Sequence, residues 1–207
     1  MLATIKFMGF GTPYIYMGEE AGLPNCDFNS IEEMKDPVSH FIYDLLSGYG
    51  MPKTLAFRLI KYGARDHSRV PMQWNNSVNG GFNEGHPTWQ CVNPSYRQIN
   101  VESDMAAERS VYRYYQKLLK IRQSSDAAIF GETREYDHDN RKIVAYSRIY
   151  GDEKLFVFCN FSSKSAAYKL PEWTKNHEVL ISNYRDLLVS NNVASLRPYE
   201  AAVIRIR

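Results

Sequence analysis

Five consecutive apolar residues, Leu155-Phe156-Val157-Phe158-Cys159, give the strongest strand signal in this chain. Successive side chains of a strand point to opposite faces, so such a run is apolar on both faces and belongs in the centre of a sheet. Residues 142–150 form a second strand candidate, and Tyr150-Gly151-Asp152 joins the two as a hairpin-type turn. The two runs predict an antiparallel hairpin inside a larger sheet.

Further short strands are expected on the C-terminal side of this hairpin, at residues 166–170, 178–182 and 201–207. In the last of them, Ile204-Arg205-Ile206-Arg207 alternates apolar and charged residues, with one face in and one face out. A series of short strands with turn residues between them is typical of an antiparallel β-sandwich. We therefore expect a β-sandwich domain over residues 126–207.

The first 125 residues have helical periodicity instead. Asp36-Pro37 has the pattern of an N-cap followed by proline at the first helical position, and Gly48 marks the end of that helix. Residues 52–62 and 104–123 are two further expected helices, and residues 12–17 are the expected strand of this part. Helical spacing gives each of the first two helices an apolar stripe, and Leu55 and Leu59 of the second are expected to face inward. These stripes consist of Val38, Phe41, Ile42, Leu45, Leu46, Leu55 and Leu59.

A long segment without periodicity, residues 63–101, follows these helices. A loop of this length is uncommon in a compact domain and is usually functional. It contains Arg65-Asp66-His67-Ser68-Arg69-Val70-Pro71-Met72-Gln73-Trp74, where charged side chains are crowded together. Its aromatic residues Trp74, Phe82 and Trp89 form either a stacking platform or a small core of the loop, and the loop core is the favoured interpretation.

A second segment, Gly11-Thr12-Pro13-Tyr14-Ile15-Tyr16-Met17-Gly18-Glu19-Glu20, is a short β-type run that ends in glycine and two carboxylates. With the loop above, it resembles the α-glucosidase (oligo-1,6-glucosidase) branch of the α-amylase superfamily, where the corresponding segments read GTPYIYQGEE and RDNARTPMQW. The resemblance extends to Trp89, Asn93-Pro94 and Arg197-Pro198-Tyr199-Glu200-Ala201, and so spans nearly the whole chain.

The resemblance implies a fold for both parts. Enzymes of this family have a (β/α)8 barrel, which needs about 250 residues, followed by an antiparallel β domain. Residues 12–17 match the last barrel strand and residues 104–123 match the last barrel helix. We therefore expect an α+β fragment, with residues 1–125 as the C-terminal remnant of a catalytic barrel and residues 126–207 as a β-sandwich.

The same resemblance implies a retaining α-glucosidase, which needs two carboxyl groups about 5 to 5.5 Å apart. In the family, the nucleophilic Asp, the acid/base Glu and a third, stabilising Asp follow the fourth, fifth and seventh barrel strands. We expect these positions upstream of Met1, so no catalytic residue is assigned and the chain alone is expected to be inactive.

Substrate-binding residues are expected at the rim of the pocket, because barrel active sites lie in the loops after the strands. Arg65 matches the arginine that reaches the glucose ring, and its planar fork suits vicinal hydroxyls. Asp66 is expected to hold that fork, and Arg69 to pair with a carboxylate of the barrel. Glu19 and Glu20 either face the substrate or serve as helix-capping or lysine-pairing carboxylates.

His67 follows Asp66, and the two together resemble an acid/base dyad. The family has Asn at the position of His67, so a hydrogen-bonding loop histidine is the favoured interpretation.

Composition limits the other classes of partner. The formal net charge of +2 argues against general binding of nucleic acid or anionic membranes. No apolar run is long enough to cross a bilayer, and no signal peptide is recognised. The three cysteines show no disulfide framework and no metal-ligand spacing. We expect a cytoplasmic protein that needs no cofactor or metal. The family resemblance, and not the composition, implies an α-glucoside oligosaccharide as the partner of the full-length parent.

One alternative to the enzyme fragment stays open. The chain could be a non-enzymatic β-sandwich module with a structural or weak glucan-binding role. In either case the apolar faces of the first helices need cover, so we expect them to pack on the β domain or to mediate self-association.

Overall fold

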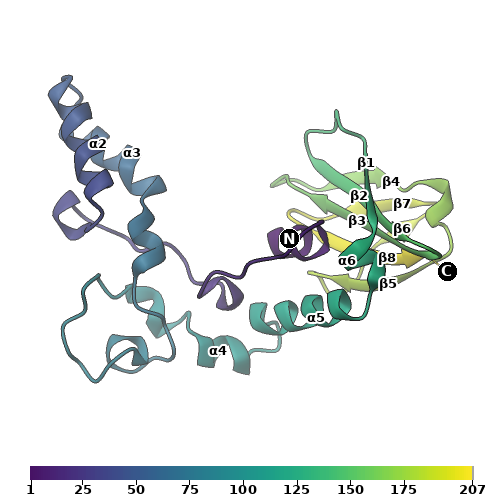
Figure 1. The fold of residues 1–207 in the computed structure, drawn as a ribbon, viewed down its shortest axis with the longest axis horizontal. Helices are drawn as coiled ribbons and strands as arrows, with labels where there is room; N and C mark the ends of the chain where they lie inside the picture. The colour runs from purple at the N-terminus through teal and green to yellow at the C-terminus, as the bar shows by residue number, and fades with distance from the viewer. Residues whose placement is uncertain (207) are drawn as a thin grey trace. The chain divides into compact units, whose positions relative to one another are not determined.

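The computed structural model describes residues 1–206, and their contacts divide the chain into two compact units (Figure 1). The β-rich unit combines Met1–Tyr14 with Arg113–Arg207, and the helical unit consists of Ile15–Tyr112. Arg207, the last residue of one expected strand, lies outside the described residues. These are units of contact, and the expected domain boundary at residues 125 and 126 stays a prediction.

The β-rich unit contains two antiparallel sheets, as the sequence predicted. The larger has the order β1-β2-β3-β8-β5 and the smaller the order β4-β7-β6. The central hairpin is confirmed, because β2 and β3 pair antiparallel up to Tyr150 and Glu153. The strands are β1 (Glu132–Tyr136), β2 (Ile143–Tyr150), β3 (Glu153–Asn160), β4 (Ala166–Lys169), β5 (His177–Ser182), β6 (Val189–Ser190), β7 (Val193–Leu196) and β8 (Ala201–Ile206).

Strand β3 is buried on both faces, and each face belongs to a different core. Phe156 and Phe158 lie in one cluster with Tyr168 of β4 and Leu196 of β7, which belong to the smaller sheet. Leu155, Val157 and Cys159 lie in a second cluster with residues of the helices. The central position that the apolar run predicted is therefore confirmed.

Helices α1 (Leu2–Met8), α5 (Val111–Gln123) and α6 (Asp126–Phe130) supply the other side of the second cluster. Two buried arginines help to hold this layer together. Arg148 donates to the carbonyl oxygens of Met8 and Gly131, at 3.0 Å and 3.2 Å. Arg122 donates to those of Phe7 and Ala128, at 2.5 Å and 3.0 Å. Burial lowers the pKa of both guanidinium groups.

The helical unit contains short elements connected by loops. They are η1 (Glu19–Ala21), η2 (Ile31–Glu33), α2 (Pro37–Gly48), α3 (Lys53–Gly63), η3 (Arg65–Arg69), η4 (Val78–Gly81), η5 (Pro94–Arg97) and α4 (Val101–Ala106). Its apolar core is a small cluster of Cys26, Phe28, Ile31, Met34 and Ala64. A 3₁₀ helix, η6 (Glu172–Thr174), belongs to the β-rich unit.

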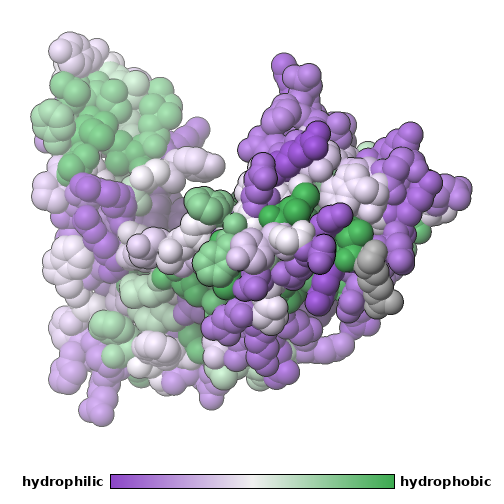
Figure 2. Space-filling model, turned by 45° about the vertical axis from the view of Figure 1, so that its right-hand side comes forward, coloured by the Kyte–Doolittle hydropathy of each residue, from purple (hydrophilic) through white to green (hydrophobic). Residues whose placement is uncertain are grey.

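Helix α2 begins as predicted, with Asp36 as its N-cap accepting a hydrogen bond from the Val38 amide at 3.2 Å. The apolar stripe of this helix is exposed in this chain. Phe41 is 66% exposed, and Val38, Ile42 and Leu45 are also exposed. In α3, Leu55 and Leu59 were expected to face inward, and that prediction is wrong because both are exposed. Figure 2 shows apolar side chains gathered over the region where Figure 1 places α2 and α3. The helical period predicted the apolar face correctly but could not show whether this chain covers it.

The expected continuous helix over residues 104–123 is also wrong. Helix α4 ends at Ala106 and α5 begins at Val111. The Asp104 carboxylate accepts hydrogen bonds from the amides of Val111 and Tyr112, at 3.0 Å and 2.8 Å. These amides belong to the first turn of α5, and the N–H groups of a first turn have no carbonyl acceptor within their own helix. Asp104 therefore caps a new helix and does not continue the first one.

Residues 12–17, expected as a strand, have no regular secondary structure and pair with no other strand among the described residues. A strand needs a neighbour to accept its main-chain hydrogen bonds. Within residues 1–206, no helix is both long and apolar enough to cross a membrane.

Candidate functional site

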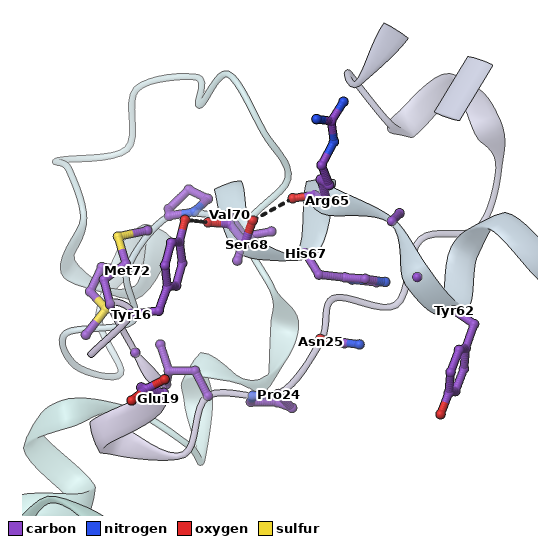
Figure 3. Close-up of a pocket in the computed structure, with 16 residues that line it drawn as sticks. Tyr16, Glu19, Pro24, Asn25, Tyr62, Arg65, His67, Ser68, Val70 and Met72 are labelled. Atoms are coloured by element: carbon purple, nitrogen blue, oxygen red, sulfur yellow. Dashed lines mark hydrogen bonds between the residues drawn. The ribbon is translucent and has the colours of Figure 1, made fainter. Parts of the chain in front are cut away.

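A pocket of about 410 Å³ opens in the helical unit (Figure 3). It is formed where the end of the Gly11–Glu20 segment meets the loop that starts at Arg65. Tyr16 connects the two, because its hydroxyl donates to the Ser68 carbonyl oxygen at 2.6 Å. Its lining comes from Tyr16 to Glu19, Leu23 to Asn25, Tyr62 to Arg65, His67 to Ser68 and Val70 to Met72. The two segments that carried the family resemblance thus form one site.

Arg65 lies at the edge of this pocket and is held by Asp36. Its Nε donates to Asp36 Oδ2 at 2.6 Å, and its Nη2 donates to Asp36 Oδ1 at 2.9 Å. This is a bidentate fork, the strongest arrangement for an arginine and a carboxylate. In Figure 3 the Arg65 side chain extends away from Tyr16 and Glu19. Its main chain stays in the pocket wall, where Ser68 Oγ donates to the Arg65 carbonyl oxygen at 2.7 Å.

Asp66 does not hold the Arg65 fork, so that prediction is wrong. Its side chain is fully buried and accepts from the amides of Lys35 and Asp36, at 2.8 Å and 3.1 Å. The Gln90 side-chain amide donates to it at 2.6 Å, and Ser39 Oγ at 3.4 Å. Asp66 therefore fixes the chain just before α2 and a distant part of the loop. It acts on Arg65 indirectly, by positioning Asp36.

Arg69 is the second cation of this network. Its Nη1 lies 3.6 Å from Asp36 Oδ2, so the carboxylate with which Arg69 pairs is Asp36. The Arg65 guanidinium, with Arg69 as a smaller contributor, holds the pKa of the Asp36 carboxyl below its usual value. The structure thus brings Arg65, Asp66 and Arg69 together around Asp36.

Glu19 and Glu20 lie in η1, and only Glu19 lines the pocket. Glu20 accepts a hydrogen bond from the Gly18 amide at 2.8 Å, so it caps the start of η1. Gly18 has a φ of 91°, in the left-handed region, and a side chain there would meet Leu23. The capping interpretation fits Glu20, and Glu19 is the one of the pair that faces the cavity.

His67 is a hydrogen-bonding loop residue, as the favoured interpretation had it. Its Nε2 lies 2.6 Å from the Lys61 carbonyl oxygen and its ring packs on Phe28. The aromatic residues of the loop do not form a core, so that prediction is wrong. Trp74, Phe82 and Trp89 are each at least half exposed.

Two contributors were missed by sequence reasoning. Asp36 was recognised as a helix cap but not as the partner of Arg65, which lies 29 residues further along the chain. An N-cap aspartate has spare acceptor capacity, and that was the available signal. Tyr16 was placed in a strand, and its contact with Ser68 depends on the tertiary structure.

The pocket offers hydrogen-bonding groups suited to a polar ligand. Its described lining includes hydroxyls from Tyr16, Tyr62 and Ser68, and Glu19 is the acidic side chain among these residues. Among residues 1–206, no group of three or more His, Cys, Asp or Glu side chains is placed to hold a metal ion. This arrangement can orient a polyhydroxylated molecule, but it offers one carboxylate where a retaining glycosidase needs two.

Comparison with known proteins places both parts of the chain. Residues 1–131 match the family described as "Alpha amylase, catalytic domain", and residues 143–203 match "Alpha-amylase SusG C-terminal domain". Oligo-1,6-glucosidase of Parageobacillus thermoglucosidasius is 41% identical over 211 residues, which cover 100% of this chain and 37% of that protein.

Two solved structures agree. Trehalose-6-phosphate hydrolase of Bacillus licheniformis superposes with a TM-score of 0.91 at 36% identity, covering 99% of this chain and 37% of that one. A mutant isomaltulose synthase from Erwinia rhapontici NX5, in complex with D-glucose, gives 0.92 at 31% identity and covers 100% and 37%. The chain spans little more than a third of the length of these relatives, and it belongs to the α-amylase family as part of its catalytic domain followed by its C-terminal domain.

Proposed function

We propose that this chain supplies one wall of the glucose-binding pocket of a retaining α-glucosidase of the oligo-1,6-glucosidase type. The complete enzyme would hydrolyse α-glucosidic bonds of oligosaccharides. The observation that carries this proposal is the pocket that joins the Gly11–Glu20 segment to the loop at Arg65. Both segments resemble the corresponding parts of α-glucosidases, and the match to oligo-1,6-glucosidase covers all of this chain.

Arg65 is the proposed substrate contact. A guanidinium group has five N–H donors, and Asp36 accepts from Nε and Nη2. The Nη1 donors stay available for sugar hydroxyls that reach the edge of the pocket, on the side of Arg65 that faces away from Tyr16 and Glu19, and the side chain is 58% exposed. The fork to Asp36 fixes the plane of the guanidinium group, so a sugar would meet a preoriented donor. Asp36, supported by Asp66, is therefore the proposed positioning residue.

The chain by itself should not catalyse hydrolysis. Retaining cleavage needs a nucleophile and an acid/base about 5 to 5.5 Å apart, and Glu19 is the acidic residue in the described pocket lining. Glu20 does not complete the pair, because it is not part of the described pocket lining and its Oε2 accepts from the Gly18 amide. The trehalose-6-phosphate hydrolase and isomaltulose synthase matches support the same pocket type with other substrates, so the preferred linkage is not part of the proposal.

The test is to incubate the purified chain with an aryl α-glucoside and to titrate it with isomaltose in a calorimeter. We expect no turnover above buffer and a dissociation constant no tighter than about millimolar, because part of a closed pocket is missing. Turnover well above buffer would contradict the inactive-chain proposal. Tight glucan binding without turnover would favour the non-enzymatic module instead.

We also propose that the exposed apolar faces of α2 and α3 mediate self-association, so that each is covered by a second copy of this chain. Sedimentation of the same sample reports this directly, as growth of the oligomer with concentration.

A further inference from the structure

Two cysteines that are far apart in sequence meet inside the helical unit. Cys26 Sγ and Cys91 Sγ lie 3.0 Å apart, although 65 positions separate the residues. Both are free thiols in this structure. Cys26 is 4% exposed and belongs to the core cluster with Phe28, and Cys91 is half-buried at the edge of that cluster. Their sequence spacing gave no sign of this pairing.

The main chain on both sides of the pair is already held in place. Asn93 Nδ2 donates to the Pro24 carbonyl oxygen at 3.0 Å, which joins the two segments directly. Gln90 is bonded to the buried Asp66 at 2.6 Å. A disulfide has a sulfur–sulfur bond of about 2.05 Å, so the two sulfurs need to approach by only about 1 Å. Rotation of the two side chains about their Cα–Cβ bonds is the movement that would close this gap.

We propose that Cys26 and Cys91 form a site of reversible disulfide modification, which closes when the chain meets a small disulfide such as glutathione disulfide. The Cys91 thiolate attacks one sulfur of glutathione disulfide, breaks its S–S bond and releases one glutathione thiolate. The Cys26 thiolate then attacks the Cys91 sulfur and releases the second glutathione. The two protein thiols are oxidised, one glutathione disulfide is reduced to two thiols, and the two protons from the protein pass to the glutathione thiolates.

The order of attack follows from exposure. A small disulfide can reach the half-buried Cys91, whereas Cys26 is enclosed by the core cluster. Burial, with the hydrogen bond to Cys91, raises the pKa of Cys26 to about 12. Since the thiolate is the attacking form, closure by Cys26 should be the slow step and should accelerate as the pH rises.

The third cysteine provides an internal control. Cys159 is fully buried in the second core cluster of the β-rich unit, and burial raises its pKa to about 12. It should stay reduced under conditions that close the Cys26–Cys91 pair.

Closing this pair would have a consequence for the pocket. Pro24 and Asn25, which directly precede Cys26, line it. A disulfide would fix that wall to the segment before η5 and close a loop of 65 residues. Constraint of a loop this long restricts the unfolded chain strongly. The inference does not depend on the proposed α-glucosidase function, because it concerns two thiols outside the sugar-contacting residues.

The experiment incubates the reduced chain with glutathione disulfide and follows it by intact-mass spectrometry, peptide mapping and thermal unfolding. We expect a loss of two hydrogens, a Cys26–Cys91 cross-linked peptide, a Cys159 that alkylates only after denaturation, and full reversal by dithiothreitol. The melting temperature of the helical unit should rise by roughly 5–15 °C on oxidation.

Two variants sharpen the test. Cys91→Ser changes a half-buried position and should abolish both the mass change and the rise in melting temperature. Cys26→Ala should instead leave a stable glutathione adduct on Cys91. The proposal is overturned if the unmutated chain keeps glutathione on Cys91 without closing, if it forms disulfide-linked dimers through Cys91, or if oxidation leaves its mass unchanged.

Discussion

In the β-rich unit, Phe156, Phe158 and their neighbours bury both faces of a central strand, whereas in the helical unit the apolar stripes of α2 and α3 lie exposed. The buried interior of the helical unit instead includes two carboxylates, Asp36 and Asp66. Burial of apolar surface stabilises by roughly 25 cal/mol per Å². Because the apolar faces of α2 and α3 are exposed, the helical unit gains less stabilisation from apolar burial. Its folded structure depends more on buried polar groups whose hydrogen bonds are satisfied.

The difference matters because mutations lower the stability of the two kinds of interior in different ways. A hydrophobic core loses stability in proportion to the volume removed from it. A buried polar network contributes modestly when complete but costs much more when one member is removed and its partners are left unsatisfied. Asp66 is such a member, since it serves two amides, a side-chain amide and a hydroxyl. Mutations can therefore separate the two units.

The largest effect is expected from Phe156→Ala in the β-rich unit. Phe156 is fully buried, and its ring centroid lies 5.3 Å from that of Tyr136 and 5.5 Å from that of Trp173. Loss of a buried phenylalanine side chain should lower the free energy of unfolding by about 4 kcal/mol. Urea unfolding followed by hydrogen exchange should locate the loss in β2, β3 and β8.

Val144→Ala is the matched control for that change. Val144 lies on the neighbouring strand β2 but is exposed, so its truncation should cost no more than about 0.5 kcal/mol. Equal effects of the two variants would contradict the assignment of Phe156 to a packed core.

Asp66→Ala should have the next largest effect, and it should act on the helical unit. The substitution leaves the buried Asp36 amide and the partly buried Lys35 amide without an acceptor, which should cost about 2–3 kcal/mol. Hydrogen exchange should show the two amides losing protection while β3 keeps its own. The exposed Asp44, on α2, is the control, since Asp44→Ala should be nearly neutral. Unchanged hydrogen-exchange protection of the Lys35 amide in Asp66→Ala would contradict the view that buried polar groups stabilise the helical unit.

The sequence predicted the β-rich unit better than the helical one, for reasons visible in particular residues. The Leu155–Cys159 run and the turn at Gly151 are local signals, and the hairpin they predicted is confirmed. Strand β1 was missed because Glu132 to Tyr136 is mainly polar and exposed, as is usual for an edge strand. Helix α5 was joined to α4 because periodicity alone did not reveal the cap made by Asp104.

The residues of the site could be predicted from the sequence, but the contacts between them could not. Residue type and crowding singled out Arg65, Asp66 and Arg69, and the structure does bring them together. Their common centre is Asp36, which comes from another part of the chain and already had a local role as a helix cap. No pattern of spacing connects residues 30 positions apart in a loop. What covers the exposed Phe41 was equally beyond reach, since a helical period shows an apolar face but not the surface that packs on it.

The smallest effect is expected from the charge pair of Asp36 and Arg65, and it depends on pH. The folded-state pKa of Asp36 is lowered, chiefly by the hydrogen bond from Arg65. A depressed carboxyl pKa stabilises the fold fully above the unfolded-state value of about 3.9, and the contribution is lost as the pH falls through the folded-state value. Arg65→Gln should raise the pKa of Asp36, measured by carboxyl-carbon NMR, and should move the acid-induced loss of order in the helical unit to higher pH. Arg69→Gln, which removes the cation at 3.6 Å, should produce a smaller shift in the same direction. An Asp36 carboxyl that titrates at its ordinary value, or equal shifts in the two variants, would mean that Arg65 does not hold Asp36 in solution. The polar order around the start of α2 would then depend on Asp66 and not on the Asp36–Arg65 pair.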